Sequence, residues 1–188
     1  KKYFETRRGT LSAVDDVSFS INEGETLGVV GESGCGKSTL GRAILRLHEP
    51  TSGKIFFNGE NILLYDKIKM KKLRSSMQII FQDPYSSLNP RMTVSQAIAA
   101  PLIIQGIFRP KEKDAIQKKV DEMMTLVGLA KRFANSYPHE LDGGRRQRIG
   151  IARALSLDPK FIVCDEPVSA LDVSIQAQIL NLMQELQE

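Results

Sequence analysis

The chain has few of the residues that mark disulfide-bonded, zinc-bound or nucleic-acid-stacking proteins. Of its 188 residues only Cys35 and Cys164 are cysteine, and neither lies in a Cys-x-x-Cys pair or a histidine-rich neighbourhood. This spacing argues against a zinc site and, in a reducing compartment, against a disulfide. Tryptophan is absent and aromatic residues make up only 6% of the chain, so no platform for stacking nucleic-acid bases is evident. We interpret both cysteines as small packing residues, with Cys35 open to oxidation or alkylation.

Long apolar runs and blocks of like charge are also lacking. The longest apolar stretch, around residues 97–104, is interrupted by Pro101 and is too short to span a bilayer, and no signal-peptide pattern opens the chain. The net charge of +4, from 26 basic and 22 acidic residues, is spread along the sequence and indicates no particular partner. We expect a cytoplasmic protein that touches a membrane only through partners. Its 41% hydrophobic content suffices for one substantial core with a small subdomain.

What the sequence does contain is a complete phosphate-binding loop, which fills each fixed position of the pattern G-x-x-x-x-G-K-[ST] at residues 31–38. Its glycines allow the tight turn in which backbone N–H groups converge on a polyphosphate. Lys37 supplies a positive charge for the β and γ phosphates, and Ser38 supplies a hydroxyl for Mg²⁺. The residues predicted to contact the nucleotide are Gly31, Ser33, Gly34, Cys35, Gly36, Lys37, Ser38 and Thr39. The loop predicts a chain that binds a nucleoside triphosphate with Mg²⁺.

The segments around the loop predict a β-rich first part. Residues 26–30 are expected to form a buried strand before the loop, and residues 40–47 a helix whose positive dipole end faces the phosphates. Residues 17–21 alternate between apolar and polar, as a half-buried strand does. Residues 54–57 predict a short strand closed by Asn58-Gly59.

From Pro84 to about Pro138 the spacing of apolar residues becomes helical. In residues 111–127, one helix face can carry Ile116, Val120, Met123, Met124 and Val127. We interpret this stripe, with its methionines, as the buried face of a helix rather than a cofactor site. We predict a helical subdomain over residues 84–140, between two segments of an ATP-binding core at 1–83 and 141–188.

Two carboxylates directly follow an apolar segment that predicts a central parallel strand. This segment, residues 161–164, is apolar on both faces, and Asp165-Glu166 would lie at its carboxyl end, where open α/β sheets bind ligands. Asp165 is expected to hold Mg²⁺, directly or through water, and Glu166 to polarise the attacking water as general base. Gln82 could reach the metal or the water, although a loop glutamine is more often only solvated. The predicted catalytic residues are Glu166, Gln82 and Lys37.

The order of these motifs resembles that of the ATP-binding cassette ATPases that drive membrane transporters. Residues 81–84 resemble the Q-loop, 141–145 the LSGGQ signature, 165–166 the end of the second Walker motif and 169–172 the D-loop. The resemblance covers essentially the whole chain. Residues 83–90 and, more weakly, 170–174 look like the importer branch for oligopeptides, dipeptides and nickel.

The resemblance implies an α/β fold: a RecA-like P-loop NTPase core with a parallel sheet, an N-terminal antiparallel β part and a helical insert. It also implies two such domains that close head to tail around two ATP molecules. In that arrangement the phosphate loop of one domain faces the signature of the other. The additional nucleotide contacts implied are Asp142, Gly143, Gly144, Arg145 and Asp172. Tyr3 or Phe4 lies where the family places an aromatic ring against adenine, and the sequence does not choose between them.

The implied function is ATP hydrolysis that energises an importer at the cytoplasmic face of the cell membrane, with oligopeptides or dipeptides as cargo. The implied partners are permease subunits held by the helical segment, a second ATPase subunit, preferably a different one, and indirectly a substrate-binding protein. Alternatives are a nickel importer, a cassette ATPase that acts on nucleic acid, and a non-hydrolysing regulatory subunit. The compact helical insert without a cysteine pair argues against a nucleic-acid partner.

The chain departs from the family pattern at two places. The usual signature serine and glutamine are Asp142 and Arg145, and an ionised carboxylate would repel a phosphate. Either this signature serves a weakened site in an unequal pair, or Asp142 turns away and caps the following helix. The family's switch histidine is also missing, and neither His48 nor His139 can replace it. We therefore expect that this chain, which ends at Glu188, is a fragment of a longer subunit. Alone, the fragment should bind ATP poorly and hydrolyse it slowly.

Overall fold

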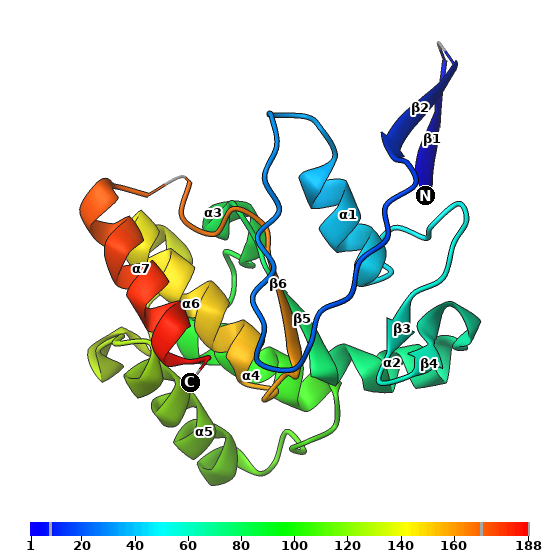
Figure 1. The fold of residues 1–188 in the computed structure, drawn as a ribbon. Coiled ribbons are helices and arrows are strands. Elements are labelled where there is room, and N and C mark those ends of the chain that lie inside the picture. Colours follow the sequence, from blue (N-terminus) through cyan, green and yellow to red (C-terminus); the bar gives the residue numbers. More distant parts are fainter. Residues whose placement is uncertain (8, 170, 188) are drawn as a thin grey trace. The chain divides into compact units, whose positions relative to one another are not determined.

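The computed structural model describes residues 1–7, 9–169 and 171–187. The chain forms two compact units, Lys1–Met70 and Lys71–Glu188 (Figure 1). Ala170 of the predicted D-loop and the final residue, Glu188, lie outside the described residues.

The first unit begins with an antiparallel hairpin of β1 (Lys2–Thr6) and β2 (Gly9–Val14), and α1 (Lys37–Ile44) follows. A second antiparallel pair, β3 (Phe56–Phe57) and β4 (Glu60–Asn61), leads into the short helix η1 (Ile62–Leu64). Asn58 and Gly59 join these strands with φ of 50° and 81°, the two positive values that a tight hairpin turn requires. The predicted Asn-Gly turn and the antiparallel N-terminal part are confirmed.

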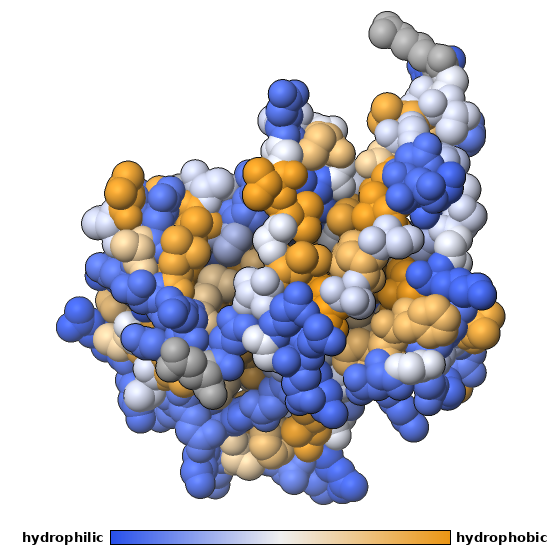
Figure 2. Space-filling model, viewed as in Figure 1, coloured by the Kyte–Doolittle hydropathy of each residue, from blue (hydrophilic) through white to orange (hydrophobic). Residues whose placement is uncertain are grey.

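Two strands that the sequence predicts in the first unit are wrong. Residues 17–21 and 26–30, all described, belong to no strand, and most of their large apolar side chains are exposed, with Val30 96% exposed. Figure 2 shows hydrophobic residues at the surface in this view. A strand is stable only when neighbouring strands satisfy its backbone groups, and apolar patterning alone does not supply such neighbours. The predicted helix after the loop exists, but α1 begins at Lys37 and ends at Ile44, three residues earlier than expected at each end.

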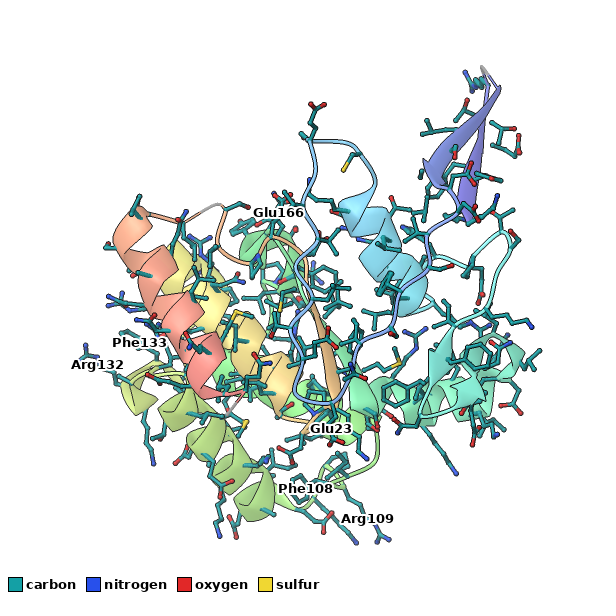
Figure 3. The ribbon with its side chains drawn as sticks, in the orientation of Figure 1. Glu23, Phe108, Arg109, Arg132, Phe133 and Glu166 are labelled. Carbon is teal, nitrogen blue, oxygen red and sulfur yellow. The ribbon has the colours of Figure 1, made fainter. Side chains whose placement is uncertain are left out.

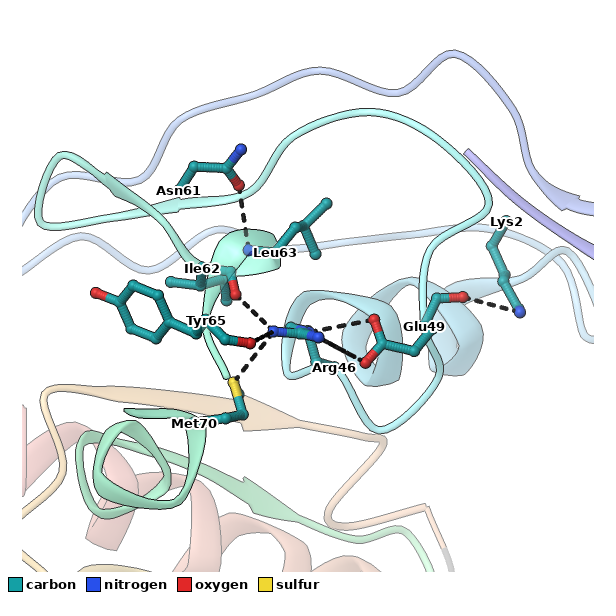
Figure 4. A network of polar contacts seen from close by, with 8 residues as sticks. All are labelled: Lys2, Arg46, Glu49, Asn61, Ile62, Leu63, Tyr65 and Met70. Atoms are coloured by element: carbon teal, nitrogen blue, oxygen red, sulfur yellow. Dashed lines mark hydrogen bonds and ion pairs between the residues drawn. The ribbon is translucent and has the colours of Figure 1, made fainter. Parts of the chain in front are cut away.

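Arg46 links the end of α1 to η1 and the chain after it (Figure 4). Its Nη1 donates to the carbonyl oxygens of Ile62 at 2.7 Å and Tyr65 at 3.1 Å, and its Nη2 pairs with Glu49 Oε1 at 2.8 Å. Arg46 itself has φ of 50°. Because one guanidinium satisfies groups from several segments, it stabilises the end of the loop-bearing helix.

The second unit contains one parallel strand pair and most of the helices. Helix α2 (Lys67–Ser76) crosses the boundary between the units and leads into β5 (Met77–Ile80), which pairs in parallel with β6 (Phe161–Cys164). Between these strands the chain forms α3 (Pro84–Ser87), α4 (Val94–Ile104), α5 (Lys113–Leu126), η2 (Lys131–Phe133), η3 (Pro138–Glu140) and α6 (Gly143–Leu155). Helix α7 (Val173–Glu185) follows β6. The helical character of residues 84–138 and the parallel strand at 161–164 are confirmed.

The core of the second unit lies between α4, α5, α6 and α7, and Figure 1 shows α7 along α6. Each helix contributes a fully buried side chain, namely Ile98, Met124, Ile149 and Ile179. The predicted apolar face of α5 packs into this core, with Val120, Met123, Met124 and Val127 buried and Ile116 packed against them. The interpretation of this stripe as a buried helix face is therefore confirmed. Among the described residues, no helix is both long and apolar enough to cross a membrane.

Candidate functional site

The phosphate-binding loop in the first unit adopts a backbone that only glycine tolerates at two of its positions. Gly34 has φ of 80° and Gly36 has φ of 100°, both in the left-handed region. A Cβ on Gly36 would lie 2.1 Å from the carbonyl oxygen of Ala13, and one on Gly31 would lie 2.6 Å from Cys35 Sγ. The close contact with Ala13 fixes the loop against the end of β2, so the glycine pattern has a direct structural cause.

Lys37 is the first residue of α1, and its side chain folds back over the loop. Its Nζ donates to the carbonyl oxygens of Gly31 at 2.9 Å and Glu32 at 3.0 Å. Residues 31–35 are exposed and residues 36–40 are half-buried. The N-terminal N–H groups of α1 and the Lys37 ammonium therefore lie at one exposed turn, an arrangement suited to binding an anion.

The two candidate adenine partners occupy adjacent positions in β1. Tyr3 donates its hydroxyl hydrogen to Asp15 Oδ1 at 2.8 Å, and this hydrogen bond raises the pKa of the tyrosine above its usual value. The Phe4 ring packs edge-on against His48, with ring centroids 5.7 Å apart, and Lys2 Nζ lies 4.7 Å from its centroid. Side chains of adjacent strand residues project to opposite faces, so the two rings lie on different sides of β1 and contact different residues.

In the second unit, the pairing of β5 with β6 brings together residues that are 84 positions apart. The register aligns Ile80 with Cys164, so the residues that follow both strands meet at the same edge. Gln82 Nε2 donates to Glu166 Oε2 at 2.9 Å and to Ser169 Oγ at 3.2 Å. The structure thus joins two of the three predicted catalytic residues, and Figure 3 labels Glu166 at this end of β6.

The chain at the end of β6 places Asp165 and Glu166 in different environments. Asp165 is buried, and its N–H donates to the carbonyl oxygen of Ile80 at 2.9 Å, which extends the strand ladder by one residue. Glu166 is exposed and has φ of 47°, an unusual value for a residue with a side chain. The chain therefore turns immediately after the two consecutive carboxylates. Non-glycine residues with such φ values are often found at functional sites.

The signature segment lies at the start of α6, and its aspartate caps the helix. Asp142 Oδ1 accepts a hydrogen bond from the N–H of Arg145 at 2.8 Å, and its Oδ2 pairs with Arg145 Nη1 at 2.7 Å. The Arg145 guanidinium also lies over the Phe133 ring, 4.8 Å from its centroid. Arg132 lies 5.0 Å from the same centroid, and Figure 3 labels Arg132 and Phe133. The cap, one of the two alternatives for Asp142, is present, and a neighbouring cation compensates the carboxylate. The weakened site in an unequal pair concerns the assembled dimer and stays a prediction.

The glycines of the signature allow close packing of α6 against the segment after β6. A Cβ on Gly144 would lie 2.8 Å from Ile175 Cγ2, and one on Gly143 would lie 3.4 Å from Leu171 Cδ2. Asp172 occupies the N-cap position of α7 in this same contact region. The signature and the D-loop are therefore adjacent within the second unit.

The predicted metal ligands Ser38, Gln82 and Asp165 carry hydroxyl, amide and carboxylate oxygens, which are the donors that Mg²⁺ prefers. Gln82 and Asp165 follow adjacent parallel strands of the second unit, and Ser38 belongs to α1 of the first unit. Within the described ranges, no group of three or more His, Cys, Asp or Glu side chains could hold a metal ion. Each of these donors is of a kind that fits a hard cation, and their joint use as ligands stays a prediction.

Two residues with contacts to the site were missed by the sequence analysis. Ser169 bonds to Gln82, and Phe133 lies under the guanidinium of Arg145. The resemblance to the D-loop included Ser169, but only the pairing of two distant strands brings it to Gln82. Phe133 lies in η2, outside every motif, and no sequence signal marks its contact with α6.

Solved structures identify the class of protein that this fold defines. The chain superposes along its entire length on the dimeric, post-hydrolysis ATP-binding cassette MJ0796 bound to ADP and Pi, with a TM-score of 0.89 and 31% identity, and covers 80% of that chain. It matches cbiO1 from Clostridium perfringens, part of an ABC transporter complex, with a TM-score of 0.81, 31% identity, and coverage of 99% of this chain and 71% of that one. The predicted fold class is confirmed.

The sequence comparison gives the family. The profile of the ABC transporter family matches residues 14–169, and the chain belongs to this family. It is 60% identical to the oligopeptide transport ATP-binding protein OppF of Bacillus subtilis and 54% identical to OppF of Salmonella typhimurium, in both cases over its whole length. The chain spans 61% and 55% of the lengths of these two relatives. The resemblance found in the sequence is confirmed, including its importer branch.

Proposed function

We propose that the chain is the ATP-binding and ATP-hydrolysing part of a membrane importer for oligopeptides. The observation that carries this proposal is the bond between Gln82 and Glu166 at the carboxyl ends of two paired strands. It places a carboxylate suited to general-base chemistry beside an amide that can sense a metal or a water. A chain that only binds nucleotide has no need of such a carboxylate.

The phosphate loop supplies the binding half of the proposed activity. The loop N–H groups and Lys37 bind the β and γ phosphates, and Glu166 accepts a proton from the attacking water. Ser38, Gln82 and Asp165 are the proposed ligands of Mg²⁺, which neutralises phosphate charge when bound. Each role follows from the chemistry of the group at its position.

The proposed cargo and partners rest on the relatives. Two of them, from Bacillus subtilis and Salmonella typhimurium, are named as oligopeptide transport ATP-binding proteins. We infer that the chain lies at the cytoplasmic face of the membrane. Its inferred partners are a permease contacted by the helical segment 84–140, a second ATPase subunit and, indirectly, a peptide-binding protein. A different rather than identical second subunit is favoured, because the signature here carries Asp142 and Arg145.

The test uses the full-length protein, purified from solubilised membranes with its copurifying chains identified. We expect permease subunits, and ATP turnover that rises with a peptide-loaded binding protein. Glu166→Gln should abolish turnover and retain ATP binding, whereas the exposed Glu185→Gln should change neither. A protein without membrane partners, or a Glu166→Gln variant with normal turnover, would overturn the proposal.

A further inference from the structure

The hydrogen bonds around Ser169 determine which way the Gln82 amide faces. The Ser169 hydroxyl lies 3.1 Å from the carbonyl oxygen of Glu166, which can only accept, so the single hydroxyl hydrogen is donated there. Ser169 Oγ can then only accept from Gln82. The group that faces it at 3.2 Å is therefore the amide nitrogen of Gln82.

The two hydrogens of that nitrogen are both used. One is donated to Glu166 Oε2 at 2.9 Å and the other to Ser169 Oγ at 3.2 Å. A carboxylate is also an acceptor only, so both partners require the same orientation of the amide. The Gln82 oxygen is consequently directed away from Glu166 and Ser169 and retains both of its lone pairs for another ligand.

Ser169 also fixes the backbone that carries Glu166. Its N–H and its hydroxyl both donate to the Glu166 carbonyl oxygen, at 3.2 Å and 3.1 Å. Glu166 has φ of 47°, a conformation that costs free energy and persists only where neighbouring groups hold it. The two hydrogen bonds from Ser169 close the turn that holds it.

We propose that Ser169 is a positioning residue, which fixes the Gln82 amide so that its nitrogen faces Glu166 and its oxygen is presented to the cation bound with the nucleotide. The inference rests on the proposed ATPase function. Substitution of Ser169 should therefore change the turnover rate and the Mg²⁺ concentration that turnover requires. It should have only a weak effect on nucleotide affinity.

The experiment compares Ser169→Ala, Ser169→Thr and Ser174→Ala in the full-length, assembled complex. Ser174 is exposed in α7, so its substitution removes a hydroxyl without touching the site. For Ser169→Ala we expect kcat to fall on the order of tenfold with KM for ATP within about twofold, because a correctly oriented group is lost rather than a binding contact. The Mg²⁺ concentration for half-maximal turnover should rise. Ser169→Thr, which keeps the hydroxyl, should restore both quantities.

A second readout does not depend on turnover. ATP with Mg²⁺ should raise the unfolding temperature of the wild type more than ATP with EDTA does, and Ser169→Ala should reduce this Mg²⁺-dependent increment. The increment is measured for each variant against its own ligand-free unfolding temperature, because loss of the Ser169 hydroxyl also removes a hydrogen bond to the Glu166 carbonyl oxygen. If wild-type turnover is normal and Ser169→Ala leaves kcat and the increment unchanged, the inference is wrong. A loss that Ser169→Thr does not restore would also overturn it. If the wild type does not hydrolyse ATP, the proposed function itself fails.

Discussion

Asp142 holds Arg145 at two points, its backbone N–H at 2.8 Å and its guanidinium Nη1 at 2.7 Å. The first contact is a helix cap and the second is an ion pair between side chains that are 58% and 44% exposed. An exposed pair of this kind contributes at most about 1 kcal/mol to stability. Its larger effect is on charge, because the guanidinium compensates the carboxylate where the family pattern has a neutral serine.

We predict that the two signature substitutions compensate each other. In the assembled complex, Arg145→Gln should lower ATP turnover several-fold, because the uncompensated Asp142 carboxylate then repels phosphate. The double variant Asp142→Ser with Arg145→Gln should recover at least wild-type turnover. Arg132→Gln, which removes a cation from the same Phe133 ring, is the matched control and should have little effect. Additive losses in the double-mutant cycle would show that the residues act independently.

The cap itself makes a separate prediction about stability. Asp142→Ala removes the acceptor for the Arg145 N–H and should lower the free energy of unfolding by about 1 kcal/mol. Asp142→Ser keeps a capping oxygen and should remain within a few tenths of a kcal/mol of the wild type. Urea unfolding of the purified protein measures both values. Equal losses in the two variants would mean that the cap contributes nothing.

The sequence predicts those parts of this structure whose signals are local. The Asn58-Gly59 turn, the apolar face of α5 and the strand at 161–164 each depend on neighbouring residues, and all are present. Residues 26–30 carry a strand-like pattern, but a strand also needs partners, which patterning does not specify. The bond from Gln82 to Ser169 requires the pairing of β5 with β6, so only the structure reveals it.

Gly36 should tolerate no side chain. A Cβ there would lie 2.1 Å from the Ala13 carbonyl oxygen, and φ of 100° is strained for any other residue. We expect Gly36→Ala to destabilise the protein by about 2–3 kcal/mol and to abolish detectable ATP binding. Gly28→Ala is the control, since a Cβ at Gly28 meets no atom within 4 Å. Comparable losses of binding and stability in both variants would disprove the argument from the Ala13 contact.

Only one of the two aromatic residues in β1 should contribute to nucleotide affinity. Tyr3 and Phe4 are adjacent strand residues and face opposite sides, so one adenine cannot contact both rings. Tyr3→Ala or Phe4→Ala, but not both, should raise the Kd for ATP about tenfold, the expected effect of losing one stacked ring. The affinity for inorganic triphosphate, which has no base, should not change. Equal effects of the two substitutions would point to a loss of fold in the hairpin.

Alkylation should distinguish the two cysteines and report on the phosphate loop. Cys35 is exposed within the loop, so ATP should protect it from N-ethylmaleimide. Cys164, at the end of β6, is also exposed, but desolvation of its thiol raises the pKa to about 11. At pH 8 only about one Cys164 thiol in a thousand is then ionised, and its reaction should accelerate as the pH rises towards 11.

Mass spectrometry of peptides from the modified full-length protein measures both rates. Modification of Cys35 at the same rate with and without saturating ATP would contradict the placement of nucleotide at this loop.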